Sequence, residues 1–135
     1  MNSLAYPMTL TPDEDSGGYV VTFPDIDWAV TQGDSLAECL TMATDCLEEC
    51  LACCIDDGLP IPEPSAIGPG SHSATPPAQI VLKVAIYLAW EEAGVSKTEL
   101  AERIGVKEAE ARRILDPRHN TKLPTLEKAL QAKKK

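Results

Sequence analysis

Five cysteines lie close together in one segment of the chain, and cysteine thiolates can bind zinc or form a redox pair. They occupy positions 39, 46, 50, 53 and 54, so Cys46, Cys50 and Cys53 follow one another at helical spacing and the last two form a C-x-x-C pair. A single helix rarely encloses a tetrahedral metal, and no second pair or neighbouring histidine completes a site. A redox pair would also stand at the start of a helix. We therefore expect buried or half-buried apolar cysteines, no metal and no cofactor.

A second group of residues has the order of a DNA-binding helix-turn-helix. Ser96 and Glu99 form a capping box that opens a short helix. Gly105 supplies the turn, because glycine accepts a positive φ, and a second helix spans residues 107–115. Six apolar residues can form one small core beneath these helices: Leu100, Ala101, Ile104, Val106, Ala111 and Ile114. The segment Ser96 to Leu130 resembles the Cro and lambda-repressor type of helix-turn-helix; the alternative is a structural helical bundle with no DNA role.

The helix of residues 107–115 is the candidate DNA-recognition element. Eight residues are candidate contacts: Lys107, Glu108 and Glu110 near base edges, Arg112 and Arg113 on bases or phosphate, and Lys97, Arg118 and Lys122 on the DNA backbone. Glu108 and Glu110 are unusual here, because glutamate can accept from cytosine N4 but also repels phosphate. A single copy should bind weakly, so we expect a dimer or tetramer that reads half-sites about one helical turn apart.

The charge of the chain is unevenly distributed. Residues 1–82 contain 13 Asp and Glu and no Lys or Arg, whereas residues 83–135 contain 8 acidic and 12 basic residues, within a net charge of −9. The first part should repel nucleic acid and attract a basic partner, while the second can approach phosphate. The alternative for the first part is an ordinary acidic solvated surface.

The elements before residue 60 follow the order strand, strand, strand, helix, so the fold class is α+β. Strands are predicted at 6–11, 19–23 and 29–32, and Ser35 with Glu38 forms a capping box that starts a helix ending near Asp57. One amphipathic helix can cover one face of so small a sheet. The other face and one edge should remain unoccupied.

A proline-rich segment separates this part from a helical series. Residues 60–77 carry six prolines and two glycines, which predicts an extended linker with a short edge strand inside it. We expect domains at residues 1–67 and 78–135 with a linker at 68–77, and further helices at 78–93 and from Pro124 to about Ala132. The sequence has no apolar run of about 18 residues and no secretory signal, so we expect a cytoplasmic protein with no membrane contact.

The order of several short motifs extends these expectations to a family. The chain contains YPMTLTPDEDSGGYVVTFPDI, then TQGDSLAEC, then IPEPS before the helix-turn-helix. In this it resembles the HicB antitoxins of bacterial HicAB toxin-antitoxin systems over essentially its full length. It departs from them at Asp27-Trp28, where the family often has Pro-Gly or a similar turn. The resemblance implies a partial RNase H-like N-terminal domain that blocks HicA, a small basic mRNA-cleaving toxin, and a C-terminal domain that represses the operon's own promoter.

The toxin should meet the free sheet face and the loops beside it. Five residues are the candidate contacts: Tyr19, Phe23, Asp25, Trp28 and Thr31. Trp28 is the expected anchor, because large aromatic residues dominate interface energies. Tyr19 and Phe23 can alternatively be core residues under the helix.

Two other functions compete with the antitoxin. The RNase H-like resemblance suggests magnesium-dependent cleavage by four acidic residues, Asp13, Asp25, Glu38 and Asp45. They lie on separate short elements and nothing marks them as convergent, so we expect no catalytic residues and no enzyme activity. The second competitor is a stand-alone transcriptional regulator with a ligand-sensing N-terminal domain. A short basic reading frame beside this one favours the antitoxin, and its absence favours the sensor.

Overall fold

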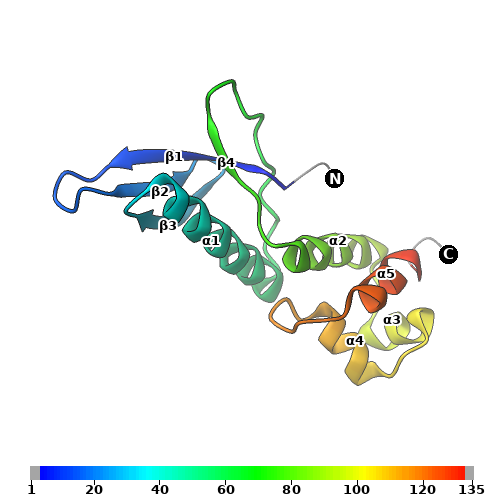
Figure 1. The fold of residues 1–135 in the computed structure, drawn as a ribbon. Helices are drawn as coiled ribbons and strands as arrows, with labels where there is room; N and C mark the ends of the chain where they lie inside the picture. The colour runs from blue at the N-terminus through cyan, green and yellow to red at the C-terminus, as the bar shows by residue number, and fades with distance from the viewer. Residues whose placement is uncertain (1–3, 133–135) are drawn as a thin grey trace. The chain divides into compact units, whose positions relative to one another are not determined.

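The computed structural model describes residues 4–132 of the 135-residue chain. The chain folds as two compact units, and its α+β class is as predicted. The first unit comprises the chain up to Leu51 together with Pro60–Pro77, and the second comprises Ala52–Leu59 and the chain from Ala78 onward. In the ribbon the sheet belongs to the first unit and the four C-terminal helices to the second (Figure 1). Within residues 4–132, no helix has the length and apolar character needed to cross a membrane.

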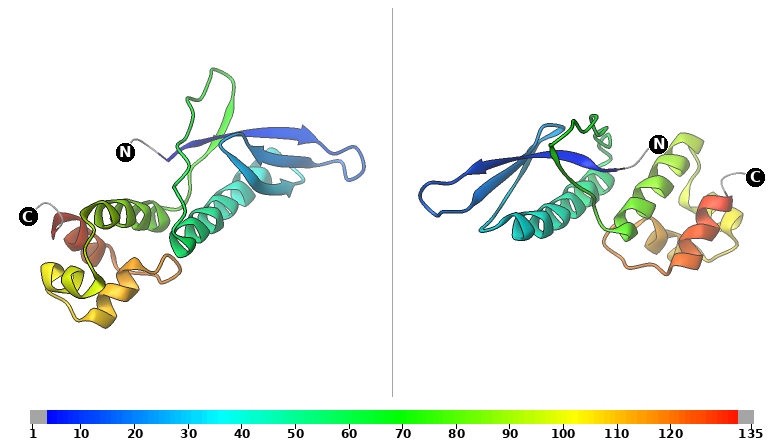
Figure 2. Two further views of the ribbon diagram at one scale, coloured as in Figure 1. Left: turned by 180° about the vertical axis from the view of Figure 1, so that it is seen from behind. Right: turned by 45° about the horizontal axis from the view of Figure 1, so that its top comes forward.

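The first unit is a four-stranded antiparallel sheet packed against one helix. Its strands are β1 (Tyr6–Pro12), β2 (Tyr19–Phe23), β3 (Ile26–Gly33) and β4 (His72–Ala74), in the order β3-β2-β1-β4. Its helix is α1 (Leu36–Asp57), which belongs to this unit up to Leu51. The first part of α1 runs along one face of the sheet in both views of Figure 2. The predicted edge strand inside the proline-rich segment is β4, which pairs with the start of β1.

The strand β2 is short because the chain reverses immediately after it. Pro24 and Asp25 form the turn, and β3 begins directly at Ile26, which pairs with Phe23 across a register shift. The third strand was predicted at 29–32, so its start was predicted three residues too late. The irregular pairing explains the error, since the sequence between Ile26 and Ala29 does not alternate as a regular strand does.

The start of α1 is fixed by the predicted capping box and by a glycine. The amide of Glu38 donates to Ser35 Oγ at 3.1 Å, while the Glu38 carboxylate accepts from the amide of Asp34 at 3.2 Å, one residue before the usual partner. A Cβ atom on Gly33 would lie 2.8 Å from the backbone nitrogen of Cys39 and 2.9 Å from its Sγ. Only glycine therefore lets β3 end so close to the first turn of α1.

The core of the first unit lies between the sheet and α1. Its buried side chains are Tyr6, Met8, Val21, Phe23, Ile26 and Ala29 from the strands and Cys39, Ala43, Leu47, Cys50 and Leu51 from α1. The opposite sheet face presents cross-strand neighbours such as Thr9, Thr22 and Val30, which are exposed or half-buried. This matches the expectation of a sheet with one covered face.

The cysteines of α1 are free thiols, and three of them belong to the apolar packing. Cys39, Cys50 and Cys54 are buried, whereas Cys46 and Cys53 are half-buried. Burial raises the pKa of the Cys46 and Cys54 thiols. A raised pKa favours the unreactive thiol over the thiolate, which agrees with the role expected for these residues.

The segment after α1 is tied to the sheet by two side chains. The Tyr6 hydroxyl donates to the Pro62 carbonyl at 2.8 Å, and the Asp25 carboxylate accepts from both the amide and the hydroxyl of Ser65. These contacts attach the IPEPS segment to a tyrosine of β1 and to the Pro-Asp turn. Although residues 60–67 form no regular element, they belong structurally to the sheet unit.

The Tyr6 contact leads to a stability prediction. Tyr6→Phe keeps the buried ring but removes the hydrogen bond to Pro62, and we expect the free energy of unfolding to fall by about 1 kcal/mol in urea titrations. Tyr19→Phe is the matched control, because this half-buried tyrosine makes no side-chain hydrogen bond within residues 4–132. Equal stability of the two variants would show that the Tyr6–Pro62 bond contributes nothing.

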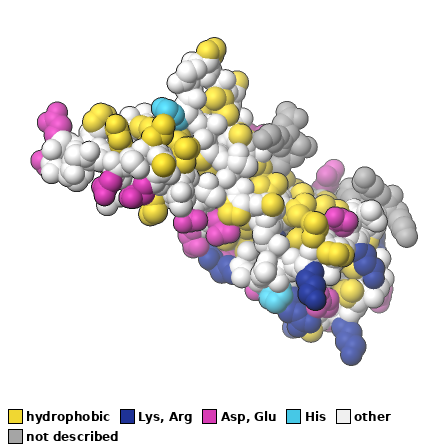
Figure 3. Space-filling model, in the orientation of Figure 1, with side chains coloured by type: hydrophobic (Ala, Val, Ile, Leu, Met, Phe, Trp, Pro, Cys, Tyr) yellow, Lys and Arg dark blue, Asp and Glu magenta, His cyan; other side chains and the backbone are white. Residues whose placement is uncertain are grey.

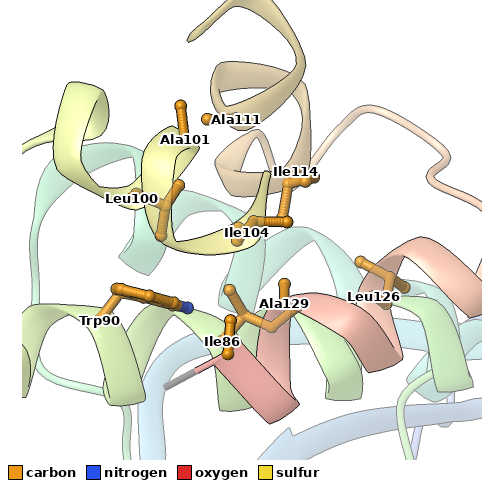
Figure 4. Close-up of a cluster of buried hydrophobic side chains, with 10 residues drawn as sticks. Ile86, Trp90, Leu100, Ala101, Ile104, Ala111, Ile114, Leu126 and Ala129 are labelled. Carbon is orange, nitrogen blue, oxygen red and sulfur yellow. The ribbon is translucent and has the colours of Figure 1, made fainter. Parts of the chain in front are cut away.

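Up to residue 132, the second unit contains four complete helices around one apolar cluster, together with the last residues of α1. They are α2 (Ala78–Ala93), α3 (Lys97–Ile104), α4 (Glu108–Leu115) and α5 (Leu123–Ala132), close to the predicted bounds. Each helix contributes to the cluster, as Figure 4 shows: Ile86 and Trp90 from α2, Leu100 and Ile104 from α3, Ala111 and Ile114 from α4, and Leu126 and Ala129 from α5. Pro124 is the second residue of α5 rather than the first.

The turn between α3 and α4 has the chemistry that the sequence predicts. Ser96 Oγ accepts from the amide of Glu99, which caps the start of α3. Gly105 ends that helix with φ of 84°, a left-handed conformation, and its amide donates to the Ala101 carbonyl at 2.8 Å. Lys107 then stands in extended conformation as the residue before α4. Two short consecutive helices are thus joined by a tight glycine turn.

Candidate functional site

The exposed face of α4 carries two arginines that are paired with acidic residues of the same helix. Arg112 donates to Glu108 at 2.7 Å, four residues earlier, and Arg113 donates to Glu110 at 2.6 Å. Both arginine side chains remain open to solvent, at 63% and 50% exposure. In the absence of DNA, the two unusual glutamates therefore pair with the arginines. Exposed ion pairs of this kind contribute about 0–1 kcal/mol, so a phosphate or base can replace the carboxylate at little cost.

The other predicted DNA contacts lie in the same unit, but they differ in whether their side chains already bond to acidic residues of the protein. Lys97, Lys107 and Lys122 are exposed. Arg118 is exposed too, but its Nε donates to Asp56 at 2.9 Å and its backbone amide donates to Asp116. Lysine and arginine side chains in Figure 3 lie over the helices of the second unit, as the charge distribution along the chain predicts. Three lysines are thus available beside α4, and Arg118 is engaged.

The end of α4 is held by a buried lysine that the sequence reasoning missed. Lys83 of α2 is only 2% exposed, and its Nζ donates to the carbonyls of Arg113 and Ile114 at 2.9 Å each and to Thr121 Oγ1 at 2.7 Å. A signal was present in the sequence, because Lys83 stands three residues after Ile80 and three before Ile86, on the apolar stripe of its helix.

The first unit offers a groove between the edge strand β3 and α1. Its volume is about 340 Å³, and it is lined by Trp28, Ala29, Val30 and Thr31 from β3 and by Met42, Asp45, Cys46, Glu49 and Cys50 from α1. Trp28 and Val30 are large apolar side chains with 52% and 60% exposure. Asp45 and Glu49 are exposed carboxylates on the same groove. We call this surface the β3–α1 groove; it combines apolar contact area with negative charge.

The structure separates the five predicted contacts of the first unit. Trp28 and Thr31 line the β3–α1 groove. Tyr19 is half-buried and lines a different hollow with Leu36 and His72, and Phe23 is a core residue at 2% exposure. Asp25 is occupied by its hydrogen bonds to Ser65. Phe23 therefore cannot offer a surface, and the alternative core role is the one that it has.

Three groove residues on α1 were absent from the toxin contacts predicted from the sequence. Met42, Asp45 and Glu49 are exposed and recur at spacings of three and four, next to the buried stripe of α1. An exposed methionine beside two carboxylates could have been noticed in the sequence. Their proximity to Trp28, however, follows only from the packing of β3 beside α1.

The four acidic residues considered for magnesium have separate structural surroundings. Asp13 accepts from the amide of Asp15 in the β1–β2 turn, Asp25 holds Ser65, and Glu38 caps α1. Asp45 lies on the β3–α1 groove. Within residues 4–132, no three His, Cys, Asp or Glu side chains lie together as metal ligands would.

Comparison with known proteins gives consistent matches along the chain. Residues 5–85 match the family described as HicB-like antitoxin of a bacterial toxin-antitoxin system. The chain is 39% identical over 132 residues to Antitoxin HicB 1 of Photorhabdus laumondii, covering 98% of this chain and 83% of that protein. It is 35% identical over 129 residues to Antitoxin HicB of Escherichia coli K12, covering 96% and 93%, and 33% identical over 130 residues to Antitoxin HicB of Pseudomonas fluorescens, covering 96% and 89%.

Proposed function

Because the chain belongs to the HicB-like antitoxin family of bacterial toxin-antitoxin systems, we propose that it neutralises a basic, mRNA-cleaving HicA-type toxin and represses its own operon. Family membership makes it a non-enzymatic regulatory protein. We propose residues 1–67 as the toxin-binding part, a partial RNase H-like β-β-β-α domain, followed by the predicted linker at 68–77. The strand β4 inside that linker pairs with β1, so the sheet of this part extends beyond residue 67. The DNA-binding part is a helix-turn-helix domain at residues 78–135. Both activities take place in the cytoplasm.

The β3–α1 groove is the observation that carries the antitoxin role. A toxin that cleaves RNA needs a basic surface to hold phosphates, and an acidic partner on that surface excludes the RNA. The groove offers Asp45 and Glu49 for toxin cations, in a part of the chain that has no Lys or Arg up to residue 82. Trp28 supplies the apolar anchor. Thr31 lines the same groove, whereas Tyr19 lines a different hollow and Asp25 is hydrogen-bonded to Ser65.

Co-purification tests the antitoxin role directly. The chain should co-purify with the product of a short basic reading frame beside its own, and co-expression should rescue cells from that product. A chain that neither binds nor protects against this product would instead be the stand-alone regulator with a ligand-sensing N-terminal domain.

The repressor role depends on α3, its glycine turn and α4. In the proposed complex α4 enters the major groove, with Lys107, Glu108 and Glu110 near base edges. Arg112 and Arg113 leave Glu108 and Glu110 and bind bases or phosphate instead. Lys97 and Lys122 contact the DNA backbone. Arg118 joins them only if it leaves Asp56. A dimer or tetramer supplies the second half-site, since the acidic first part of each copy opposes DNA binding.

The two kinds of DNA contact lead to different expected results. If Arg113 reads a base rather than a phosphate, Arg113→Ala should lower affinity for the DNA upstream of the chain's own reading frame about tenfold and relax the sequence preference, because it removes a base contact. Lys122→Ala should weaken binding to all sequences alike and reduce the slope of log affinity against log salt by about one. Gel shifts on upstream and scrambled DNA at two salt concentrations measure both effects. Binding that ignores salt and both substitutions would make the helical unit a dimerisation module.

A further inference from the structure

Lys83 stands out among the charged residues of the second unit because it is buried against the backbone of another helix. It lies in the second turn of α2 and donates three hydrogen bonds, two to the last carbonyls of α4 and one to the Thr121 hydroxyl. Lysine is almost never fully buried, because removing an ammonium group from water is costly. The position therefore calls for a role that an apolar residue could not supply.

A second side chain of α2 strengthens the same connection. Gln79, one turn before Lys83, donates from Nε2 to the Thr121 carbonyl at 3.0 Å and accepts from the Thr121 amide at 2.9 Å. Thr121 stands at the end of the loop between α4 and α5. Lys83 thus holds the end of α4 and Gln79 holds the end of the following loop. We call these five hydrogen bonds the α2 clamp.

The clamp acts at the C-terminal end of a helix that is too short to be stable by itself. The helix α4 has 8 residues, about two turns, and its last carbonyls have no donors within the helix. The amide of Asp116 donates to the Arg112 and Arg113 carbonyls, but it belongs to the loop that follows. A positive charge at this end is favourable, because the carbonyl end of a helix carries a partial negative charge.

We propose that Lys83 is a positioning residue for DNA binding, which fixes the C-terminal end of α4 so that its outward face can enter the major groove. This inference rests on the proposed repressor function. Lys83 itself touches no DNA, since its ammonium group is enclosed by the protein. It acts through Arg113 and Ile114, whose carbonyls it holds while the Arg113 side chain points to solvent.

The titration of Lys83 separates positioning from stability. Burial lowers the pKa of Lys83 to about 8, partly opposed by Asp116 in the loop and Glu110 on α4; Gln79 on α2 and Thr121 before α5 are uncharged. The folded chain thus releases this proton between pH 8 and 10.5, whereas the unfolded chain keeps it. Stability contributed by this group therefore rises with pH in that window. The neutral amine has only two donors for three acceptors and no charge, so its hold on α4 weakens.

The test compares Lys83→Met in the full-length chain with Lys128→Met, which removes an exposed lysine of α5 and has the same effect on net charge. At pH 7, Lys83→Met should bind the upstream DNA about tenfold more weakly than the wild type, with unchanged binding to scrambled DNA. Lys128→Met should discriminate between the two DNAs as the wild type does. Between pH 7 and pH 9 the wild type should lose affinity for upstream DNA while its unfolding midpoint rises, and Lys83→Met should show neither change.

Several outcomes would overturn the proposal. If Lys83→Met loses the same affinity for upstream and for scrambled DNA, Lys83 acts only through its positive charge. If the DNA affinity of the wild type rises with pH as its unfolding midpoint does, Lys83 has only a structural role. If the wild type itself does not prefer upstream DNA, the proposed repressor function fails, and amide hydrogen exchange then decides the role of Lys83. Faster exchange in Lys83→Met confined to residues 112–122 supports positioning, whereas unchanged exchange there rejects it.

Discussion

Replacing Trp28 with alanine should weaken toxin binding by about 30- to 100-fold without unfolding the protein. Trp28 is 52% exposed on the edge strand β3, so its removal leaves the core of the sheet unit intact. A large aromatic residue that becomes buried in an interface typically contributes about 2 kcal/mol or more. Calorimetry with the purified product of the neighbouring basic reading frame measures the loss, and thermal unfolding of the variant alone checks the fold.

The control for Trp28→Ala is Leu59→Ala. Leu59 is a comparably exposed apolar residue, at 45%, and it lies outside the β3–α1 groove. A double variant, Asp45→Asn with Glu49→Gln, should reduce the association rate and its dependence on salt, because it removes the negative charge of the groove. Toxin affinity that is unchanged in Trp28→Ala would remove this groove from the interface, whatever the other variants do.

A chain that ends at Pro77 should retain full toxin neutralisation and lose all operator binding. Residues 60–77 carry Pro62, Ser65 and β4, all of which are bonded to the sheet, so the cut must follow them. The removed part contains α2 to α5 and with them every proposed DNA contact. Survival of toxin-expressing cells and gel shifts on upstream DNA measure the two activities separately.

A second cut, after Gly70, is the matched control because it removes β4 and leaves β1 with an unpaired edge. It should lower the stability of the fragment and weaken its protection of cells. If the fragment ending at Pro77 is itself unfolded by circular dichroism, the proposed domain boundaries are contradicted. Residues 52–57, the end of α1 that groups with the helical unit, would then be the part of the helix that needs its helical partners.

Local chemistry allowed most of the elements to be predicted from the sequence. Ser35 and Ser96 each cap the helix that they were expected to cap, and Gly105 adopts the expected positive φ. Such signals act within a few residues, so they do not depend on the rest of the fold. The start of β3 was missed because Ile26 pairs with Phe23 across an irregular register, which local alternation cannot reveal.

The candidate site was less accessible to sequence reasoning because its residues come from separate elements. Trp28 was identified as an exposed aromatic, but Met42 and Glu49 become its neighbours only when β3 packs beside α1. Phe23 and Trp28 look alike in sequence, and only the sheet shows that one is core and the other surface. Lys83 was missed for the converse reason, since a lone lysine is usually assigned to solvent.

The carboxylates that hold Arg112 and Arg113 have a consequence for copy number in the cell. Each glutamate cancels the charge of its arginine at a distance, and exchanging it for an arbitrary phosphate only replaces one exposed ion pair with another, so α4 is only weakly attracted to the bulk of the chromosome. At the operator, contacts with bases add binding free energy that the exchange of a carboxylate for a phosphate does not supply. Because glutamates of α4 pair with its arginines, fewer copies of the repressor are then held at the millions of competing sites in a genome. Under the proposed function, a small pool suffices to keep one promoter occupied.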